Sequence, residues 1–224
     1  MLLTTTQVTG SNHYFQAYKE PVIWPVLFLF PLLAYLWQVM EKYILSEIFT
    51  LIPGELYTAE CGETALKEQF SLNGEYLYKE YTCNSPNAVV AYAIGQTYTG
   101  QESEAAKELP VKSDTVYPFI VKMLEESSAI GSFNKVIFHY SKEKKLSHIV
   151  ISAGEELKIA NCFKADTFES ALYFLFLSIK QLQMNPKQCT VRVCWDIMPE
   201  QEATIGKFFK GVEKNNLSEL ICKI

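Results

Sequence analysis

The stretch from residue 135 to the C-terminus constrains the fold more than any other part of the chain, because its apolar segments follow one another with few residues to spare. Three strand-like segments come first, separated only by a polar turn and by a turn around Gly154, which is free to adopt a positive φ. Connections this short predict an antiparallel meander. The segments are 135–140, 146–152 and 156–163, and the polar turn is 141–145.

A long amphipathic helix is predicted after the meander. Asp166 can cap its start, with Glu169 three residues later, and Asn185-Pro186 ends it. Its apolar side chains recur at helical spacing, which predicts a broad face packed on the sheet, and we expect Tyr173 to be buried there too. Six residues define this face: Phe168, Leu172, Leu175, Phe176, Ile179 and Leu182.

Three further elements complete the region. They are a short strand at 190–195, a helix from Pro199 through Lys214 and a last strand at 220–224. Three strands followed by helix, strand, helix and strand predict a mixed sheet with helices on its faces. This is the element order of the ribonuclease-H-like fold, which actin, sugar kinases and Hsp70 chaperones share.

Strands and helices alternate in the first part of the chain as well, so both halves follow one α/β plan. Gly131 marks the predicted boundary, which gives a first half at 1–130 and a second half at 131–224. Asp114 can cap the last helix of the first half. The predicted strands are 13–19, 47–52, 75–83 and 88–94, with a turn at 84–87, and the predicted helices are 26–42, 55–70, 100–109 and 116–126.

An uncharged apolar stretch at 21–40 is long enough to span a bilayer. Pro25 and Pro31 interrupt it, and almost no Lys or Arg flanks it to set an orientation. It also lacks the basic start and small-residue cleavage site of a signal peptide. We favour a buried helix bent at Pro31 over a membrane span, and the membrane alternative stays open.

The net charge bears on which partners the protein binds, and the cysteines bear on the cellular compartment in which it folds. The formal net charge is −5, which argues against nucleic acid as a partner. The six cysteines contain no CxxC pair, so we expect reduced thiols in a cytoplasmic protein.

Three segments resemble a known family: FTLIPGELY at 49–57, NAVVAYAI at 87–94 and, most specifically, the run at 157–186. They are similar to the bacterial domain-of-unknown-function family 3822. The resemblance implies an actin-like ATPase fold with two ribonuclease-H-like halves and no established activity. The first half departs from the family pattern, because the expected opening hairpin is shortened or missing before His13, so we expect an incomplete first sheet. Asn161, Phe163, Tyr173, Gln181 and Leu182 occupy the places of the family pattern.

Actin-like ATPases hold Mg-nucleotide between their halves through hairpins that contain Asp and Gly. In the second half that hairpin is 138–149, which has neither residue. The lysines at 142–145 offer charge but no backbone cradle for a phosphate. No Gly-rich adenosine loop is present either, so ATP hydrolysis is not expected.

Two other site chemistries fit only in part. Glu169 and Asp196 lie near two of the carboxylate positions of ribonuclease-H-type nucleases, but the strand at 135–140 has no acidic residue. His139, His148 and Cys162 fall on neighbouring strands, yet they are too few to predict a metal site. We expect these residues, and Asn161 and Asp166, to have structural roles. No catalytic residue and no metal ligand is assigned.

These observations favour a non-catalytic actin-like module that binds a protein partner or a small ligand in a cleft between its halves. Two alternatives remain. One is a degenerate ATP-binding enzyme that uses the lysines at 142–145, and the other is a scaffold anchored in a membrane through residues 21–40.

Overall fold

The computed structural model describes residues 42–72, 76–95 and 116–222. The chain divides into two compact units, 1–40 and 41–224, and every described residue belongs to the second. No helix in the described part of the chain is long and apolar enough to cross a bilayer. The predicted strand at 13–19, the helix at 100–109, the Asp114 cap, the apolar stretch at 21–40 and all but the last residue of the helix at 26–42 lie outside the described residues. That last residue, Lys42, begins a strand.

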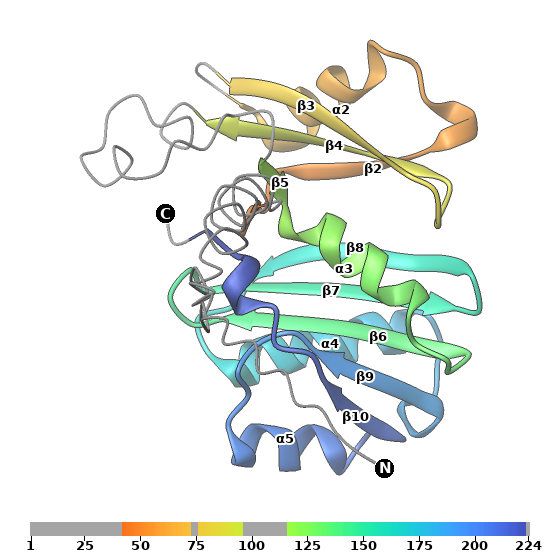
Figure 1. The fold of residues 1–224 in the computed structure, drawn as a ribbon, viewed down its shortest axis with the longest axis vertical. Coiled ribbons are helices and arrows are strands. Elements are labelled where there is room, and N and C mark those ends of the chain that lie inside the picture. The colour runs from red at the N-terminus through yellow and green to blue at the C-terminus, as the bar shows by residue number, and fades with distance from the viewer. Residues whose placement is uncertain (1–41, 73–75, 96–115, 223–224) are drawn as a thin grey trace, which may run out of the picture. The chain divides into compact units, whose positions relative to one another are not determined.

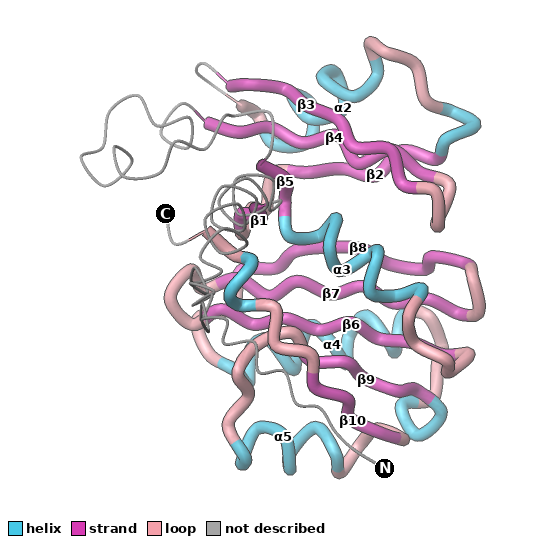
Figure 2. The backbone as a smooth tube through the Cα atoms, in the orientation of Figure 1, coloured by secondary structure: helices cyan, strands magenta, loops and turns pink. Residues whose placement is uncertain are grey.

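A five-stranded mixed sheet forms the largest layer (Figure 1). Its strand order is β10-β9-β6-β7-β8, with β7 antiparallel to both neighbours and β9 parallel to β6 and β10. The loops within the meander are short (Figure 2), as the sequence predicts, and Gly154 has a φ of +63°. The strands are β6 (Asn134–Ser141), β7 (Leu146–Ala153), β8 (Glu156–Lys164), β9 (Cys189–Val193) and β10 (Gly211–Lys214).

The main helix of this region is α4 (Phe168–Gln181), which begins one residue later than the Asp166 cap predicts. Thr167 is the N-cap residue, because its backbone is extended and its hydroxyl accepts a hydrogen bond from the backbone N–H of Ser170 at 3.2 Å. Asp166 instead forms an exposed ion pair with Lys145 at 3.0 Å. The prediction of an Asp166 cap was therefore wrong.

One side of α4 faces the sheet, and Tyr173 is not on it. Ile179 is buried, as predicted, whereas Phe176 is only half-buried and Tyr173 is 62% exposed. Residues advance about 100° each around a helix, so Tyr173 points away from the sheet-facing Leu175 and Ile179. The burial prediction was therefore wrong for Tyr173, while Phe176 still contacts the core that α4 forms with the sheet.

The C-terminal elements differ from the prediction. The helix α5 (Pro199–Gly206) ends eight residues before Lys214, and residues 211–214 form the edge strand β10. Parallel pairing with β9 outweighs the local helical pattern there. The predicted strand at 220–224 is also wrong where it is described: a 3-10 turn, Ser218–Leu220, is followed by a single bridge from Ile221 to Tyr43.

A smaller antiparallel sheet, in the order β2-β4-β3, forms from the first half. The single helix predicted at 55–70 is split into a 3-10 turn, Gly54–Leu56, and α2 (Cys61–Phe70). The helix predicted at 116–126 begins only at residue 119, because Pro118 disfavours a helical backbone in the residue before it. The elements are β1 (Lys42–Ile44), β2 (Phe49–Pro53), β3 (Tyr76–Cys83), β4 (Ala88–Gly95), β5 (Val116–Pro118) and α3 (Phe119–Ser128), and β1 pairs with β5 in parallel.

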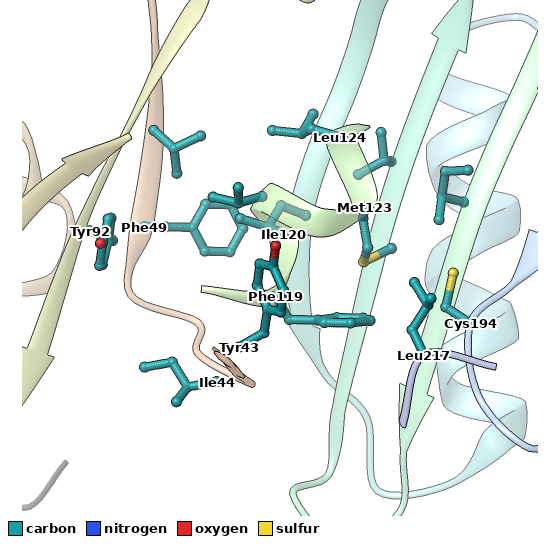
Figure 3. Packing of buried hydrophobic residues seen from close by; sticks show 14 of the residues in the cluster. Tyr43, Ile44, Phe49, Tyr92, Phe119, Ile120, Met123, Leu124, Cys194 and Leu217 are labelled. Atoms are coloured by element: carbon teal, nitrogen blue, oxygen red, sulfur yellow. The ribbon is translucent and has the colours of Figure 1, made fainter. Parts of the chain in front are cut away.

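Two apolar cores cover the two faces of the five-stranded sheet. On one face, α4 and α5 pack against the sheet. On the other face, α3 contributes to a core that also contains residues of the smaller sheet (Figure 3). Figure 3 shows Phe119, Ile120 and Met123 of α3 among the side chains of this core. Because α3 packs on both sheets, its C-terminal end brings first-half residues onto the second-half sheet.

Candidate functional site

The hairpin that would hold phosphate in an actin-like ATPase is the tip between β6 and β7. Residues 142–145 form an exposed turn, in which Lys145 has a φ of +53°. Lys145 is paired with Asp166. The turn therefore presents exposed side chains, with no glycine to bring backbone N–H groups close to a phosphate.

The two residues considered for a nuclease site do not come together with a third acid. Glu169 is exposed in the first turn of α4, and Asp196 is exposed in the loop after β9. Within the described residues, no group of three His, Cys, Asp or Glu side chains is arranged to hold a metal ion. Neither residue gains a catalytic role from the structure.

The histidines considered for metal binding are buried next to each other. His139 pairs with His148 across the β6–β7 ladder, with their ring centroids 5.8 Å apart, and His148 pairs with Cys162. The His148 Nε2–H donates to the backbone oxygen of Ser46 at 3.1 Å, since a carbonyl oxygen only accepts. In both rings Nδ1 is buried and has no hydrogen-bond partner among the described residues. Phe119 packs on the His139 ring with centroids 4.7 Å apart.

Burial lowers the pKa of both imidazoles, so both are uncharged at neutral pH. It lowers the pKa of His148 to about 4, against the opposing effect of the Ser46 hydrogen bond. Burial, with a smaller contribution from the charge of His148, holds the pKa of His139 well below its usual 6.5. Burial also raises the pKa of the Cys162 thiol, so this cysteine stays protonated at neutral pH.

Residues of the family pattern have local roles. Asn161 Oδ1 accepts a hydrogen bond from the Cys162 backbone N–H at 2.8 Å. Phe163 stacks on Phe174 of α4, with ring centroids 4.7 Å apart. Gln181 is the last residue of α4 and Leu182 is its C-cap. The residues of the family pattern thus lie on β8 and on α4, the two elements that this part of the chain connects.

A charged network joins the C-terminal part of α3 to the sheet. Arg192 of β9 donates from Nη1 to Glu126 Oε2 at 3.1 Å and from Nη2 to Glu213 Oε2 at 2.8 Å. Asn215 Nδ2 also donates to Glu126 Oε2, at 2.8 Å. The Arg192 and Glu126 side chains are only 14% and 15% exposed. This network fixes the end of α3 over β9 and β10.

Beside this network lies a cavity of about 110 Å³. It is far smaller than the several hundred cubic ångströms typical of drug-sized sites, so it has room only for a small molecule. Its wall comes from four places: the β3–β4 turn, the end of α3, the first residues of β6 and the end of the β7–β8 hairpin. The lining residues are Ser85, Pro86, Leu124, Ser127, Ser128, Lys135, Ser152, Gly154 and Glu155.

Hydroxyl groups dominate the polar part of this lining. Ser127 Oγ on α3 and Ser152 Oγ on β7 are buried and lie 3.0 Å apart in a mutual hydrogen bond. Gly154 also lines the cavity, in a turn that requires its positive φ. Its N–H donates to the Phe133 oxygen at 2.7 Å. A side chain at this position would meet the Phe133 ring as well as strained backbone.

Lys135 is the basic residue of the cavity wall. It is half-buried and forms no ion pair or hydrogen bond within the described residues. It pairs in register with Ser152 on one side and Thr190 on the other, so all three side chains leave the sheet on the α3 face. Among the described residues, Lys135 makes no hydrogen bond to any of the four serines that line the cavity, Ser85, Ser127, Ser128 and Ser152.

Sequence reasoning did not identify this cavity. Its residues come from segments far apart in the chain, and each has an ordinary local role at a turn, a helix end or a strand start. A signal becomes visible only once the strand register is known: Lys135, Ser152 and Thr190 are polar positions at the same end of three neighbouring strands.

A family profile described as "Protein of unknown function (DUF3822)" matches residues 7–210 of the chain. The chain belongs to this family. Its fold is also similar to that of a solved structure from Bacteroides thetaiotaomicron, described as a protein with actin-like ATPase fold and unknown function.

That structural match has a TM-score of 0.61 and 21% sequence identity, and it covers 77% of this chain and 66% of the other. At this identity the likeness establishes the fold alone, an actin-like ATPase fold. A comparison with curated proteins found no match.

Proposed function

We propose that this member of the family is a non-catalytic binding module, which takes a small polar ligand in the cavity beside Lys135. The observation that carries the proposal is the composition of the wall. Ser85 and Ser127 belong to the predicted first half, 1–130, whereas Lys135 and Ser152 belong to the predicted second half, 131–224. Actin-like folds bind ligands between their halves, and this cavity has polar groups from both.

The missing phosphate machinery supports a function without ATP turnover. The β6–β7 tip has no glycine and no aspartate, and its Lys145 is already paired with Asp166. A magnesium nucleotide needs both a backbone cradle and a carboxylate or its equivalent for the metal. The ligand we propose is therefore smaller than a nucleotide and binds at the opposite end of the β6–β7 hairpin.

The cysteines fit a cytoplasmic location, which is part of the proposal. All six are free in the structure. Burial raises the pKa of Cys194 to about 12 and that of Cys83 to about 11, so these thiols are inert at neutral pH. Unpaired structural thiols are typical of reducing compartments.

A thermal-shift screen tests the proposal, because a ligand that binds the folded state raises its apparent stability. We expect saturable shifts from some small polar compounds and no magnesium-dependent shift from ATP or ADP. The variant Ser128→Trp places a large side chain at the exposed edge of the cavity and should abolish the compound-induced shifts.

The matched control is Gln69→Trp, an exposed position near the C-terminal end of α2. It should respond to the compounds as the wild type does. Equal loss of response in both variants, or an unchanged response in Ser128→Trp, would exclude the cavity as the binding site. A saturable magnesium-dependent shift with ATP would replace the proposal with the nucleotide-binding alternative.

A further inference from the structure

Two basic residues lie on the α3 face at this end of the sheet, and they are used differently. Arg192 is held by two carboxylates, Glu126 and Glu213, at 3.1 and 2.8 Å. Lys135 is only two register positions from Arg192, because it pairs with Thr190, yet no carboxylate meets it among the described residues. The charge that borders the cavity is therefore available to a ligand.

The groups around Lys135 limit what kind of anion fits. The α3 helix ends at Ser128, and the negative end of its dipole is directed at the cavity side, although the carbonyl oxygens of Glu125, Glu126 and Ser127 each already accept a hydrogen bond. Glu155 adds a carboxylate to the wall. A dianion such as phosphate would meet these negative groups with one lysine to offset them, whereas a single negative charge can pair with Lys135 alone.

The same negative groups favour a ligand that also carries hydrogen-bond donors. Carbonyl and carboxylate oxygens accept hydrogen bonds and attract positive charge. The Ser127 and Ser152 hydroxyls already bond each other, and each oxygen keeps accepting capacity for a further donor. A ligand with an acidic end and a donating end would match both parts of the wall.

We propose, building on the binding function above, that the ligand is a small carboxylic acid with an amino or hydroxy group on the neighbouring carbon. Its carboxylate pairs with the ammonium group of Lys135, and its amino or hydroxy group donates toward the end of α3 and Glu155. A cavity of about 110 Å³ limits it to the smallest members of that class.

Isothermal titration with four probes tests the assignment: glycine, glycolate, inorganic phosphate and glycerol. We expect glycine or glycolate to bind and phosphate and glycerol to bind at least tenfold more weakly. The result separates the two sources of the chemistry, since an amino acid ligand favours glycine and a hydroxy acid favours glycolate. Lys135→Gln should weaken binding of the carboxylate about tenfold or more, because a charge-assisted hydrogen bond is lost.

The matched control is Lys142→Gln at the exposed hairpin tip, which should leave the affinity unchanged. Ser128→Trp, compared with Gln69→Trp, reports whether a probe binds in the cavity at all. Binding of the carboxylate that is equally strong in Lys135→Gln would overturn the ligand assignment.

The outcomes also separate this inference from the proposed function. If phosphate or glycerol binds in a manner that Ser128→Trp abolishes while the carboxylates do not bind, the ligand class is wrong and the binding site stands. If none of the four probes binds, or all bind equally to Ser128→Trp, the ligand class is overturned. The proposed function fails separately, if the thermal-shift screen finds no compound whose effect Ser128→Trp abolishes.

Discussion

The two faces of the five-stranded sheet are covered in different ways. The face under α4 and α5 is packed almost entirely with apolar side chains, including Phe138, Leu175 and Val191. The face under α3 contains buried histidines, a serine pair, the Arg192 network and a polar cavity. Buried polar groups cost stability unless they are satisfied, so a face that keeps them is the better candidate for function.

The largest effect should come from the apolar face. Leu175→Ala removes a side chain with 0% exposure from α4 and should lower the free energy of unfolding by about 3 kcal/mol, through lost burial and a residual cavity. Tyr173→Ala on the outer side of the same helix should change it by less than about 0.5 kcal/mol. Urea unfolding of both variants measures the difference, and a large loss in Tyr173→Ala would mean that α4 packs in another rotation.

The α3 face should make stability depend on acidity. The folded-state pKa of His148 is about 4 and the unfolded value is near 6.5, so the unfolded state binds more protons between these pH values. Stability is then fully present above about pH 6.5 and falls as pH decreases toward 4, by about 3 kcal/mol for this group. His148→Phe should flatten the profile of unfolding free energy against pH. An unchanged slope in this variant would show that His148 is not buried as described.

The Arg192 network should have an intermediate effect. Arg192→Met leaves Glu126 mostly buried without its strongest partner, although Asn215 and Lys122 still bind it. We expect a loss of about 2 kcal/mol, below the usual cost of breaking a fully buried pair. The double variant Arg192→Met with Glu126→Leu should recover part of that loss in urea unfolding. No recovery would argue that the two side chains act independently.

The smallest effect concerns the start of α4. Thr167→Ala should cost about 1 kcal/mol, because the Ser170 N–H loses its cap. Asp166→Ala should cost less, since its ion pair with Lys145 is exposed. Thermal unfolding of the two variants orders them, and a greater loss in Asp166→Ala would restore the cap that the sequence suggested.

The sequence predicts the meander and the strand β9 well, because tight turns and alternating apolar residues act locally. It fails where tertiary pairing or a single backbone restraint decides the structure. β10 has only four residues and depends on its parallel partner, and the start of α3 depends on Pro118. Tyr173 was misplaced because an aromatic residue in an apolar helix was assigned to the wrong side.

The candidate site was harder to predict than the fold. The lack of a phosphate-binding hairpin could be predicted, because the sequence at 138–149 contains neither glycine nor aspartate. The residues that line the cavity could not be predicted, because Ser127, Lys135 and Ser152 become neighbours only through the packing of α3 on the sheet. A polar cavity built from separate segments leaves no local motif.

The most direct test of the account compares the two ends of the β6–β7 hairpin by amide NMR of the full chain. We predict that glycine or glycolate shifts the backbone amides of Ser127, Ser152 and Gly154, and that Mg-ATP leaves the amides of residues 142–145 unchanged. Shifts at 142–145 with Mg-ATP, and none at the cavity with either small acid, would contradict it.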